Sequence, residues 1–295
     1  MDKCMSLSVF ESVFHFSSKH LSSLSKDSSW QPSPADLEGF RKAQNLAYSA
    51  AVAVSKELRP GISEKEAAKL LKTYLHDHGA RSFLHRPFAW FGDRSRFLNL
   101  GFYMRYLPSD RKLKEDDVYI LDVSPVVNGY TGDIGYTSSL SPHPELTRAK
   151  NFLLDLRKEI PVLFLKAKTP GEVWKRVNER VLEAGFANCH ALYPFAVLGH
   201  RVYRKFPFAK FSSYLLPISY VSWFSYQALL SFSKRGVFPE TLTEEHKGEK
   251  LGLWAIEPHI GGNGFGAKFE EIIVVEKDRV YWLSDDVPHI TETKG

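Results

Sequence analysis

Five residues of this chain have the side chains that a centre with two divalent cations needs. Asp122 and Glu257 end apolar runs, Glu270 opens one, and Asp133 and His200 each follow a glycine. Four carboxylates and one imidazole could hold two divalent cations and present a metal-bound hydroxide to a substrate. Such a donor set suits Mn²⁺, Co²⁺, Fe²⁺ or Zn²⁺. The pattern therefore predicts a hydrolase with two divalent metal ions.

The order of these residues, with their neighbours, resembles the M24, or pita-bread, metallopeptidase family. This family includes methionine aminopeptidase, Xaa-Pro aminopeptidase and creatinase. The resemblance runs from about Leu37 to Trp282 and is carried by residues 121–137, Ile256-Glu257-Pro258 and residues 266–271. It implies an α+β, pita-bread fold, in which duplicated αβ halves surround a curved antiparallel sheet.

The resemblance also implies a role for each of the five residues. Asp122 would bind one ion, Asp133 and Glu270 would bridge the two ions, and His200 and Glu257 would complete the second. Bound ions lower the pKa of water and polarise the carbonyl that is cleaved. Glu257 is also the candidate catalytic residue that moves a proton from water to the leaving amine.

Four further residues compete for roles at this centre or near it. Glu271 is next to Glu270, but neighbouring residues on a strand face opposite sides, and the family pattern favours Glu270. His76 and His78 close a predicted helix and are expected at the surface. His85 precedes a Trp-Phe-Gly stretch that looks like the family's substrate pocket, so it is either a pocket residue or a structural one.

The accessory histidines of the peptidases are the main departure from the family pattern. Phe208 stands near the position of one, and residues 101–105 contain no histidine where the other is expected. Losing both would remove help with proton transfer and charge stabilisation. His259, two residues after Glu257, is a candidate to compensate, because residues two apart on a strand share a face.

The elements that position these residues follow an α+β order in two rounds. Hydrophobic periodicity, capping patterns and turn residues predict helices at 35–58, 63–79, 144–158 and 169–185, with 160–167 as a continuation of the third. They predict strands at 118–127, 134–140, 252–257, 269–276 and 279–283. Helix pair, strands, helix pair, strands is a duplicated layout.

Composition narrows the classes of protein to consider. The chain has 295 residues, 43% of them hydrophobic and 25% charged, which is ordinary for a soluble globular protein. Cys4 and Cys189 offer no disulfide framework, so we expect the cytoplasm. The net charge of +5 comes without a basic cluster interleaved with aromatic residues, so no nucleic-acid partner is expected.

The predicted metal-binding domain covers 35–295, preceded by one unusual segment and containing another. Residues 1–34 form a Ser-rich N-terminal extension, whose apolar stretch is too interrupted for a secretory signal. An aromatic insert is expected at 205–245, and its residues 211–233 carry no charge. These residues are interpreted as a buried insert or substrate-side element, with weak contact to a membrane surface as the alternative.

We expect the chain to cleave an N-terminal peptide (amide) bond, as an aminopeptidase of the Xaa-Pro type acting on a peptide or small amide. A creatinase-like or other enzyme for a small non-peptide substrate is the first alternative, which the missing accessory histidines favour. A non-catalytic binding module is the second. The complete ligand set argues against it, because buried carboxylates repel one another without metal. The oligomeric state is left open, with a homodimer among the states to test.

Overall fold

The structure is a computed structural model, and it describes residues 32–98, 105–193, 196–204 and 241–291. The expected N-terminal extension lies outside the described residues except for 32–34. Of the aromatic insert, only 241–245 is described, so the expectations for residues 211–233 and for Phe208 fall outside the structure. Among the described helices, none has the length and apolar composition that crossing a membrane would require.

Within the described residues, four long helices follow one another in two pairs, one pair in each half of the chain. They are α2 (Pro34–Glu57), α3 (Glu64–Asp77), α4 (Pro144–Lys166) and α5 (Pro170–Glu183), and a short α9 (Pro288–Thr291) follows near the end. Side chains cap them: Ser33 and Asp36 form a capping box on α2, and Ser63 and Glu66 form one on α3. The hydroxyl of Thr169 accepts a hydrogen bond at the start of α5.

The strands of the described residues pair in four small antiparallel sheets. One sheet has the order β2 (Phe88–Phe91), β3 (Val118–Val123), β6 (Ile134–Ser139), and another has β1 (Ser82–Phe83), β4 (Pro125–Val127), β5 (Tyr130–Thr131). A third has β12 (Gly266–Lys268), β11 (His259–Gly261), β7 (Ala187–Asn188). The largest has β14 (Val280–Trp282), β13 (Glu271–Val275), β10 (Gly252–Ile256), β8 (Gly199–Arg201), β9 (Thr241–Leu242).

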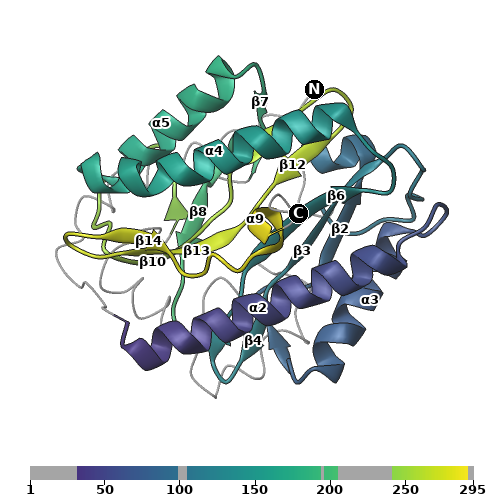
Figure 1. Cartoon of the computed structure of the whole chain (residues 1–295), viewed down its shortest axis with the longest axis horizontal. Coiled ribbons are helices and arrows are strands. Elements are labelled where there is room, and N and C mark those ends of the chain that lie inside the picture. Colours follow the sequence, from purple (N-terminus) through teal and green to yellow (C-terminus); the bar gives the residue numbers. More distant parts are fainter. Residues whose placement is uncertain (1–31, 99–104, 194–195, 205–240, 292–295) are drawn as a thin grey trace, which may run out of the picture.

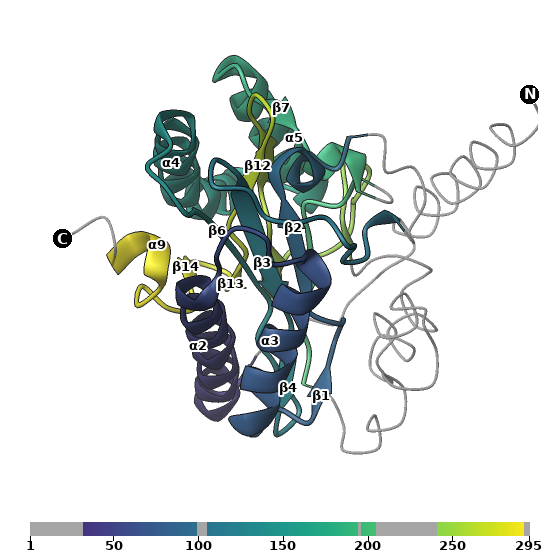
Figure 2. The same ribbon diagram turned by 90° about the vertical axis from the view of Figure 1, so that its right-hand side faces the viewer.

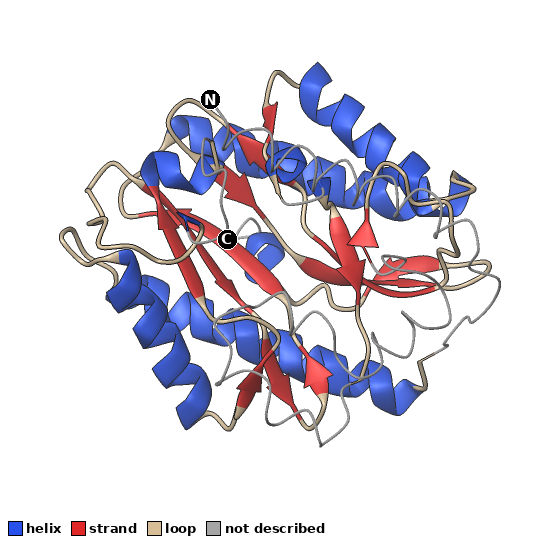
Figure 3. Cartoon of the chain, turned by 180° about the vertical axis from the view of Figure 1, so that it is seen from behind, coloured by secondary structure: helices blue, strands red, loops and turns tan. Residues whose placement is uncertain are grey.

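Helices α2 and α4 lie across the same face of the strands. Figure 1 shows both in front of the strands, and the view from behind in Figure 3 shows the strands in front of them. Figure 2 shows α9 beside α2, on the same side of the strands as α4. One apolar core lies under α4 and α5 and includes Trp254 and Phe164, and another lies under α2 and α3 and includes Leu71 and Leu121. The α+β layout in two rounds that the sequence predicts is therefore present.

The structure differs from the predicted elements where the chain changes sheets. The predicted strand 118–127 is broken at Ser124, because β3 and β4 belong to different sheets. The predicted strand 269–276 begins only at Glu271, and β12 lies before it in another sheet. In contrast, the stretches 144–158 and 160–167 form the single helix α4, which continues through Pro161.

Candidate metal centre

Asp122 and Asp133 come from the first half of the chain. Asp122 lies in β3, directly opposite Gly135 of β6, and Asp133 stands just before β6 begins. A Cβ at Gly132 would lie 2.2 Å from the backbone of Ala43 in α2. Only glycine lets the chain pass this close to the helix, and this passage delivers Asp133 beside Asp122.

The second half of the chain supplies three more residues, each at a point where a strand is paired or ends. His200 lies in β8 opposite Ala255 of β10, and Glu257 follows the last residue of β10. Glu270 stands between β12 and β13, where the chain passes from one sheet to another. The hydroxyl of Tyr48 in α2 donates a 2.9 Å hydrogen bond to the carbonyl oxygen of Glu270 and so holds this junction.

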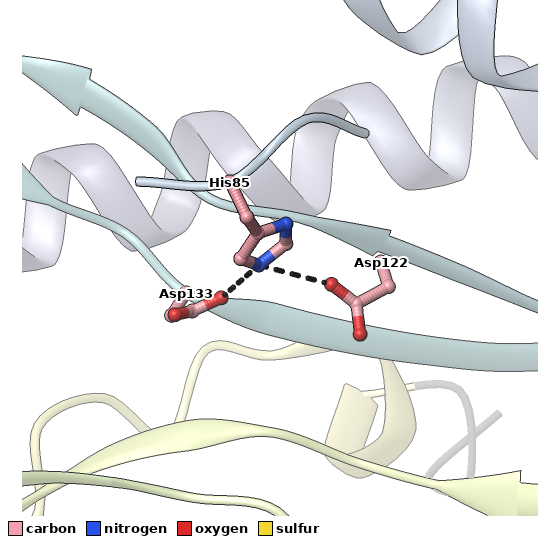
Figure 4. A group of neighbouring side chains, drawn as sticks. All are labelled: His85, Asp122 and Asp133. Atoms are coloured by element: carbon pink, nitrogen blue, oxygen red, sulfur yellow. Dashed lines mark hydrogen bonds and ion pairs between the residues drawn. The ribbon is translucent and has the colours of Figure 1, made fainter. Parts of the chain in front are cut away.

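The side chains from the two halves converge on one buried place. Two groups of potential ligand atoms each lie within 4.8 Å of one another: His85, Asp122 and Asp133 form one, and Asp133, His200 and Glu270 form the other. Asp133 belongs to both groups, as a bridging ligand would. Figure 4 shows the imidazole of His85 between the carboxylates of Asp122 and Asp133.

Both imidazoles present the same nitrogen to this place. The Nδ1 of His85 lies 2.8 Å from the carbonyl oxygen of Arg86, and the Nδ1 of His200 lies 3.1 Å from that of Arg201. A carbonyl only accepts, so Nδ1 carries the proton in each ring and Nε2 faces the carboxylates. The Nε2 atoms of both rings lie 3.1 Å from oxygens of Asp133. Backbone anchoring of this kind orients histidines that bind metals.

A lysine lies in the middle of the carboxylates, and sequence reasoning assigned it no role. The Nζ of Lys268 is 2.7 Å from Asp122 Oδ2, 2.7 Å from Glu257 Oε2 and 3.0 Å from Glu270 Oε2. Its side chain is only 1% exposed. The signal that could have found it is strand alternation, because Lys268 is two residues before Glu270 and therefore shares its face.

The clustered charges change the proton affinities of the groups. Burial lowers the pKa of His85, but the carboxylates of Asp133 and Asp122 raise it, to about 9 overall. Burial raises the pKa of Asp133, yet His85 and His200 beside it hold it well below its usual range. Burial, together with the negative charges of Asp133 and Glu257, holds the pKa of Glu270 well above its usual value.

Glu271 points away from this cluster. Its carboxylate accepts two hydrogen bonds from Arg157, of 2.6 and 2.8 Å, and lies 2.6 Å from Nε2 of His289. Both of its oxygens are therefore engaged by cationic or donating groups under α4. Glu270 is thus the neighbour that faces the other carboxylates, and the side chains of residues 270 and 271 point in different directions.

His259 does not share a strand with Glu257, contrary to the sequence expectation. Strand β10 ends at Ile256, and His259 begins β11 in a different sheet. It is fully buried, and its Nδ1 lies 3.1 Å from the hydroxyl of Tyr193. Burial and the charge of Lys268 hold its pKa well below its usual value. His259 belongs to neither donor group, and its catalytic role stays a prediction.

His85 is closer to the carboxylates than the sequence suggested. Residues 101–105, before Asp122, contain no histidine, but the pairing of β2 with β3 places Phe88 opposite Asp122 and brings His85 beside it. The expectation that His85 lines a pocket or is structural did not foresee contact with two metal-ligand candidates. His76 and His78 are exposed, as expected.

The donors present fit a divalent ion. Oxygen and imidazole ligands suit Mn²⁺, Co²⁺, Fe²⁺ and Zn²⁺, and one carboxylate oxygen, Asp122 Oδ1, is buried without a hydrogen bond in the structure. The group of Asp133, His200 and Glu270 is fully buried and combines two carboxylates with one imidazole. The ligand roles of these residues remain predictions that metal analysis tests.

Comparison with known proteins agrees with this geometry. The profile described as Metallopeptidase family M24 matches residues 38–277. The methionine aminopeptidase of Helicobacter pylori is 29% identical over 116 residues, which are 38% of this chain and 46% of that protein. Methionine aminopeptidase 1 of Bacillus subtilis is 24% identical over 148 residues, 50% of this chain and 58% of that protein. The matches thus span about half the length of these curated relatives.

Solved structures show the same fold. The X-Pro aminopeptidase of Thermotoga maritima has a TM-score of 0.63 at 17% identity, and the match covers 86% of this chain and 62% of that one. The prolidase of Pyrococcus furiosus has a TM-score of 0.60 at 19% identity, with 85% and 64% covered. The expected α+β, pita-bread fold is confirmed by these likenesses.

Proposed function

This chain belongs to metallopeptidase family M24, and from that premise we propose that it is a metal-dependent aminopeptidase that cleaves an N-terminal peptide bond. The observation that carries the proposal is the convergence of His85, Asp122 and Asp133 with His200 and Glu270 in two donor groups that share Asp133. The carboxylate and imidazole donors of these groups suit a divalent ion, with Mn²⁺, Co²⁺, Fe²⁺ and Zn²⁺ as the candidates.

The chain's own residues would divide the work of hydrolysis. A divalent ion, when bound, lowers the pKa of water and polarises the scissile carbonyl. Glu257 is the proposed proton carrier: burial raises its pKa, and although Lys268 opposes the rise, the pKa stays above the usual value for a glutamate. A carboxyl group with a raised pKa can accept a proton from water and give it to the leaving amine.

For the substrate we propose a peptide with proline in the second position. The solved structures with the same fold are an X-Pro aminopeptidase and a prolidase, while the curated relatives are methionine aminopeptidases. A peptide series that varies the first two residues separates the two preferences. Creatine, a guanidino acid, and small amides belong in the same series, because a creatinase-like activity is the alternative from the sequence.

A specific observation favours a second candidate function, a non-catalytic binding module. Lys268 places a positive charge among Asp122, Glu257 and Glu270, so the carboxylates are partly compensated without any metal. The repulsion that argued against a metal-free module is therefore smaller than the sequence suggested. Metal binding without turnover of any peptide or amide would favour this candidate.

The test combines metal analysis with turnover. Protein reconstituted with Mn²⁺, Co²⁺ or Zn²⁺ is assayed against Xaa-Pro peptides, methionine-initiated peptides and small amides. Asp133→Asn should lose bound metal and turnover together, because Asp133 belongs to both donor groups. Asp116→Asn, an exposed carboxylate outside both groups, is the matched control and should change neither. Equal turnover in the two variants would refute a metal centre at these residues.

The location and extent of the functional unit are also proposals. We propose residues 35–295 as one catalytic domain and the cytoplasm as its location. The cytoplasm is proposed from cysteine usage alone, since Cys4 and Cys189 offer no disulfide framework. Fluorescence microscopy of a tagged chain, with a secreted marker as the reference, tests the location.

A further inference from the structure

The centre already contains a cation that belongs to the chain. The ammonium group of Lys268 contacts the carboxylates of Asp122, Glu257 and Glu270 at 2.7 to 3.0 Å. In the ligand set expected from the sequence, Asp122 binds one ion, Glu257 binds the other, and Glu270 bridges. Lys268 therefore contacts residues from both ion positions at once.

Contacts between β6 and β12 fix the position of the Lys268 side chain. Its backbone N–H donates to Thr137 Oγ1 at 2.9 Å, and the same hydroxyl donates to its carbonyl oxygen at 2.7 Å. Its aliphatic stem lies over Gly135, where an added Cβ would come within 2.3 Å of Lys268 Cε. A glycine on β6 thus makes room for this side chain, and the aromatic ring of Tyr193 lies 5.9 Å from Nζ.

Apart from Glu257 Oε2, the oxygens that Lys268 and His85 contact are those of one ion position. Asp122 lies against both, with Oδ2 at 2.7 Å from Lys268 Nζ and Oδ1 at 3.3 Å from His85 Nε2. Asp133 Oδ1 lies 3.1 Å from His85, and Glu270 Oε2 lies 3.0 Å from Lys268. The remaining oxygens of the two bridging candidates, Asp133 Oδ2 and Glu270 Oε1, face His200 Nε2 at 3.1 and 4.0 Å.

We infer that Lys268 takes the place of one of the two metal ions, so that the chain holds a single divalent ion, bound by Asp133, His200 and Glu270. This inference rests on the proposed function, since it concerns the same centre. A fixed ammonium and a second divalent ion compete for the same carboxylate oxygens. Two cations that share these oxygens would lie close together, and like charges at close range repel strongly in a buried place. The lysine is covalently attached, so it is always present at high local concentration.

The experiment counts ions in matched variants. Metal-stripped protein is saturated with Co²⁺ or Mn²⁺, freed of excess ion and measured by native mass spectrometry and elemental analysis. The wild type should hold one ion, and Lys268→Arg, which keeps the charge, should also hold one. Lys268→Met removes the charge at similar length and should hold two. Lys158→Met, an exposed lysine of α4 paired with Asp155, is the control and should hold one.

A second route to the same result keeps the lysine in the sequence. Gly135→Ala places a methyl group where the stem of Lys268 lies, so the lysine has to shift, and we expect a second ion to bind where the ammonium is displaced. Without metal, Lys268→Met should melt at a lower temperature than the wild type, since three carboxylates lose their counter-charge, and Co²⁺ should restore most of the loss. This comparison reports on the lysine even where the assay detects no turnover.

The possible failures are distinguishable. Two ions of similar affinity in the wild type, unchanged in Lys268→Met, would overturn the inference and leave the proposed metallopeptidase intact. One ion in both the wild type and Lys268→Met would also overturn it, because the lysine would then not be what excludes the second ion. No ion in any well-folded variant would remove the metal centre and the inference together.

Discussion

At the scale of single residues, two roles are proposed for Glu257. It contacts Lys268 at 2.7 Å, and it is the candidate for moving a proton during hydrolysis. A glutamine keeps the shape of the side chain and one oxygen for the ion or the lysine, but it cannot take up a proton. The two roles can therefore be separated by this substitution.

We predict that Glu257→Gln lowers turnover of the best peptide substrate by at least about a hundredfold, because general acid–base catalysis contributes roughly 10²–10⁴-fold. Bound metal should be retained, since Asp133, His200 and Glu270 are unchanged. Steady-state kinetics and elemental analysis of the same preparation measure both. Glu276→Gln, a residue paired with Arg279 away from the centre, is the control. Turnover within a few-fold of the wild type would exclude proton transfer by Glu257.

The residues of the centre differ in how far the sequence could predict them. Asp122 and Glu257 stand at the ends of apolar runs, so local pattern alone marks them. His85 and Asp133 are 48 residues apart, and only the pairing of β2 with β3 brings the imidazole to the carboxylates. The spacing of two residues between Lys268 and Glu270 could have indicated that their side chains share a face. A lysine is not a metal ligand, however, so a pattern of ligand residues does not include it.

At the scale of elements, capping residues were the most reliable signals. The Ser63 and Glu66 pattern predicted the start of α3, and the capping box is present with both hydrogen bonds. The ends of strands were harder to predict from the sequence, because a run of apolar residues does not show where the chain leaves one sheet for another. The changes of sheet at Ser124 and at Glu270 depend on pairing with distant strands.

The capping box of α3 gives a prediction about pH. Hydrogen bonds from the side chain and backbone of Ser63 lower the pKa of Glu66 from its usual 4.5 to about 2. Because the folded pKa is the lower one, Glu66 contributes stability above about pH 4.5, and the contribution is lost as the pH falls towards 2. Glu66→Gln should therefore be less stable than the wild type at pH 7, and the gap should narrow between pH 5 and pH 3.

Urea unfolding at a series of pH values measures this gap. Asp77→Asn is the matched control, since Asp77 lies at the opposite end of the same helix, where a negative charge is not favoured. Its difference from the wild type should be small or of opposite sign at pH 7. A gap for Glu66→Gln that is constant with pH would show that the charge of Glu66 does not stabilise the helix end.

The contact between α4 and β13 gives a second prediction for packed elements. Arg157 of α4 holds the fully buried Glu271 through two hydrogen bonds and also donates to the carbonyl of Ser284. Arg157→Met leaves the carboxylate with His289 alone, and breaking a buried pair in this way costs about 3–5 kcal/mol. Thermal unfolding should show the loss.

Two controls identify the cause of that loss. Lys158→Met removes an exposed charge from the next position of α4 and should cost less than about 1 kcal/mol. The double variant Arg157→Met with Glu271→Met replaces both partners by apolar groups and should recover much of the stability. A double variant as unstable as Arg157→Met alone would mean that the orphaned carboxylate is not the source of the cost.

At the scale of the whole molecule, the centre joins the two halves of the chain. Asp122, Asp133 and His85 come from the part of the chain that follows α2 and α3, while His200 and Glu270 come from the part that follows α4 and α5. The duplicated order of elements was predictable from sequence periodicity. Which residues of one half meet those of the other was predictable only through the family resemblance, because no local pattern encodes contacts over such separations.

A ligand that binds across the halves should stabilise the folded chain as a unit. A divalent ion that binds only the folded state adds about 2.7 kcal/mol at a concentration one hundred times its Kd. For a chain of 295 residues, that corresponds to a rise in Tm of about 4 °C. We therefore predict such a rise when Mn²⁺ or Co²⁺ is added to chelator-treated protein, measured by scanning calorimetry. Asp133→Asn should show no metal-dependent rise, because it loses a ligand of both donor groups. If the ion raises Tm equally in Asp133→Asn, it binds elsewhere on the molecule, and the halves are held together without it.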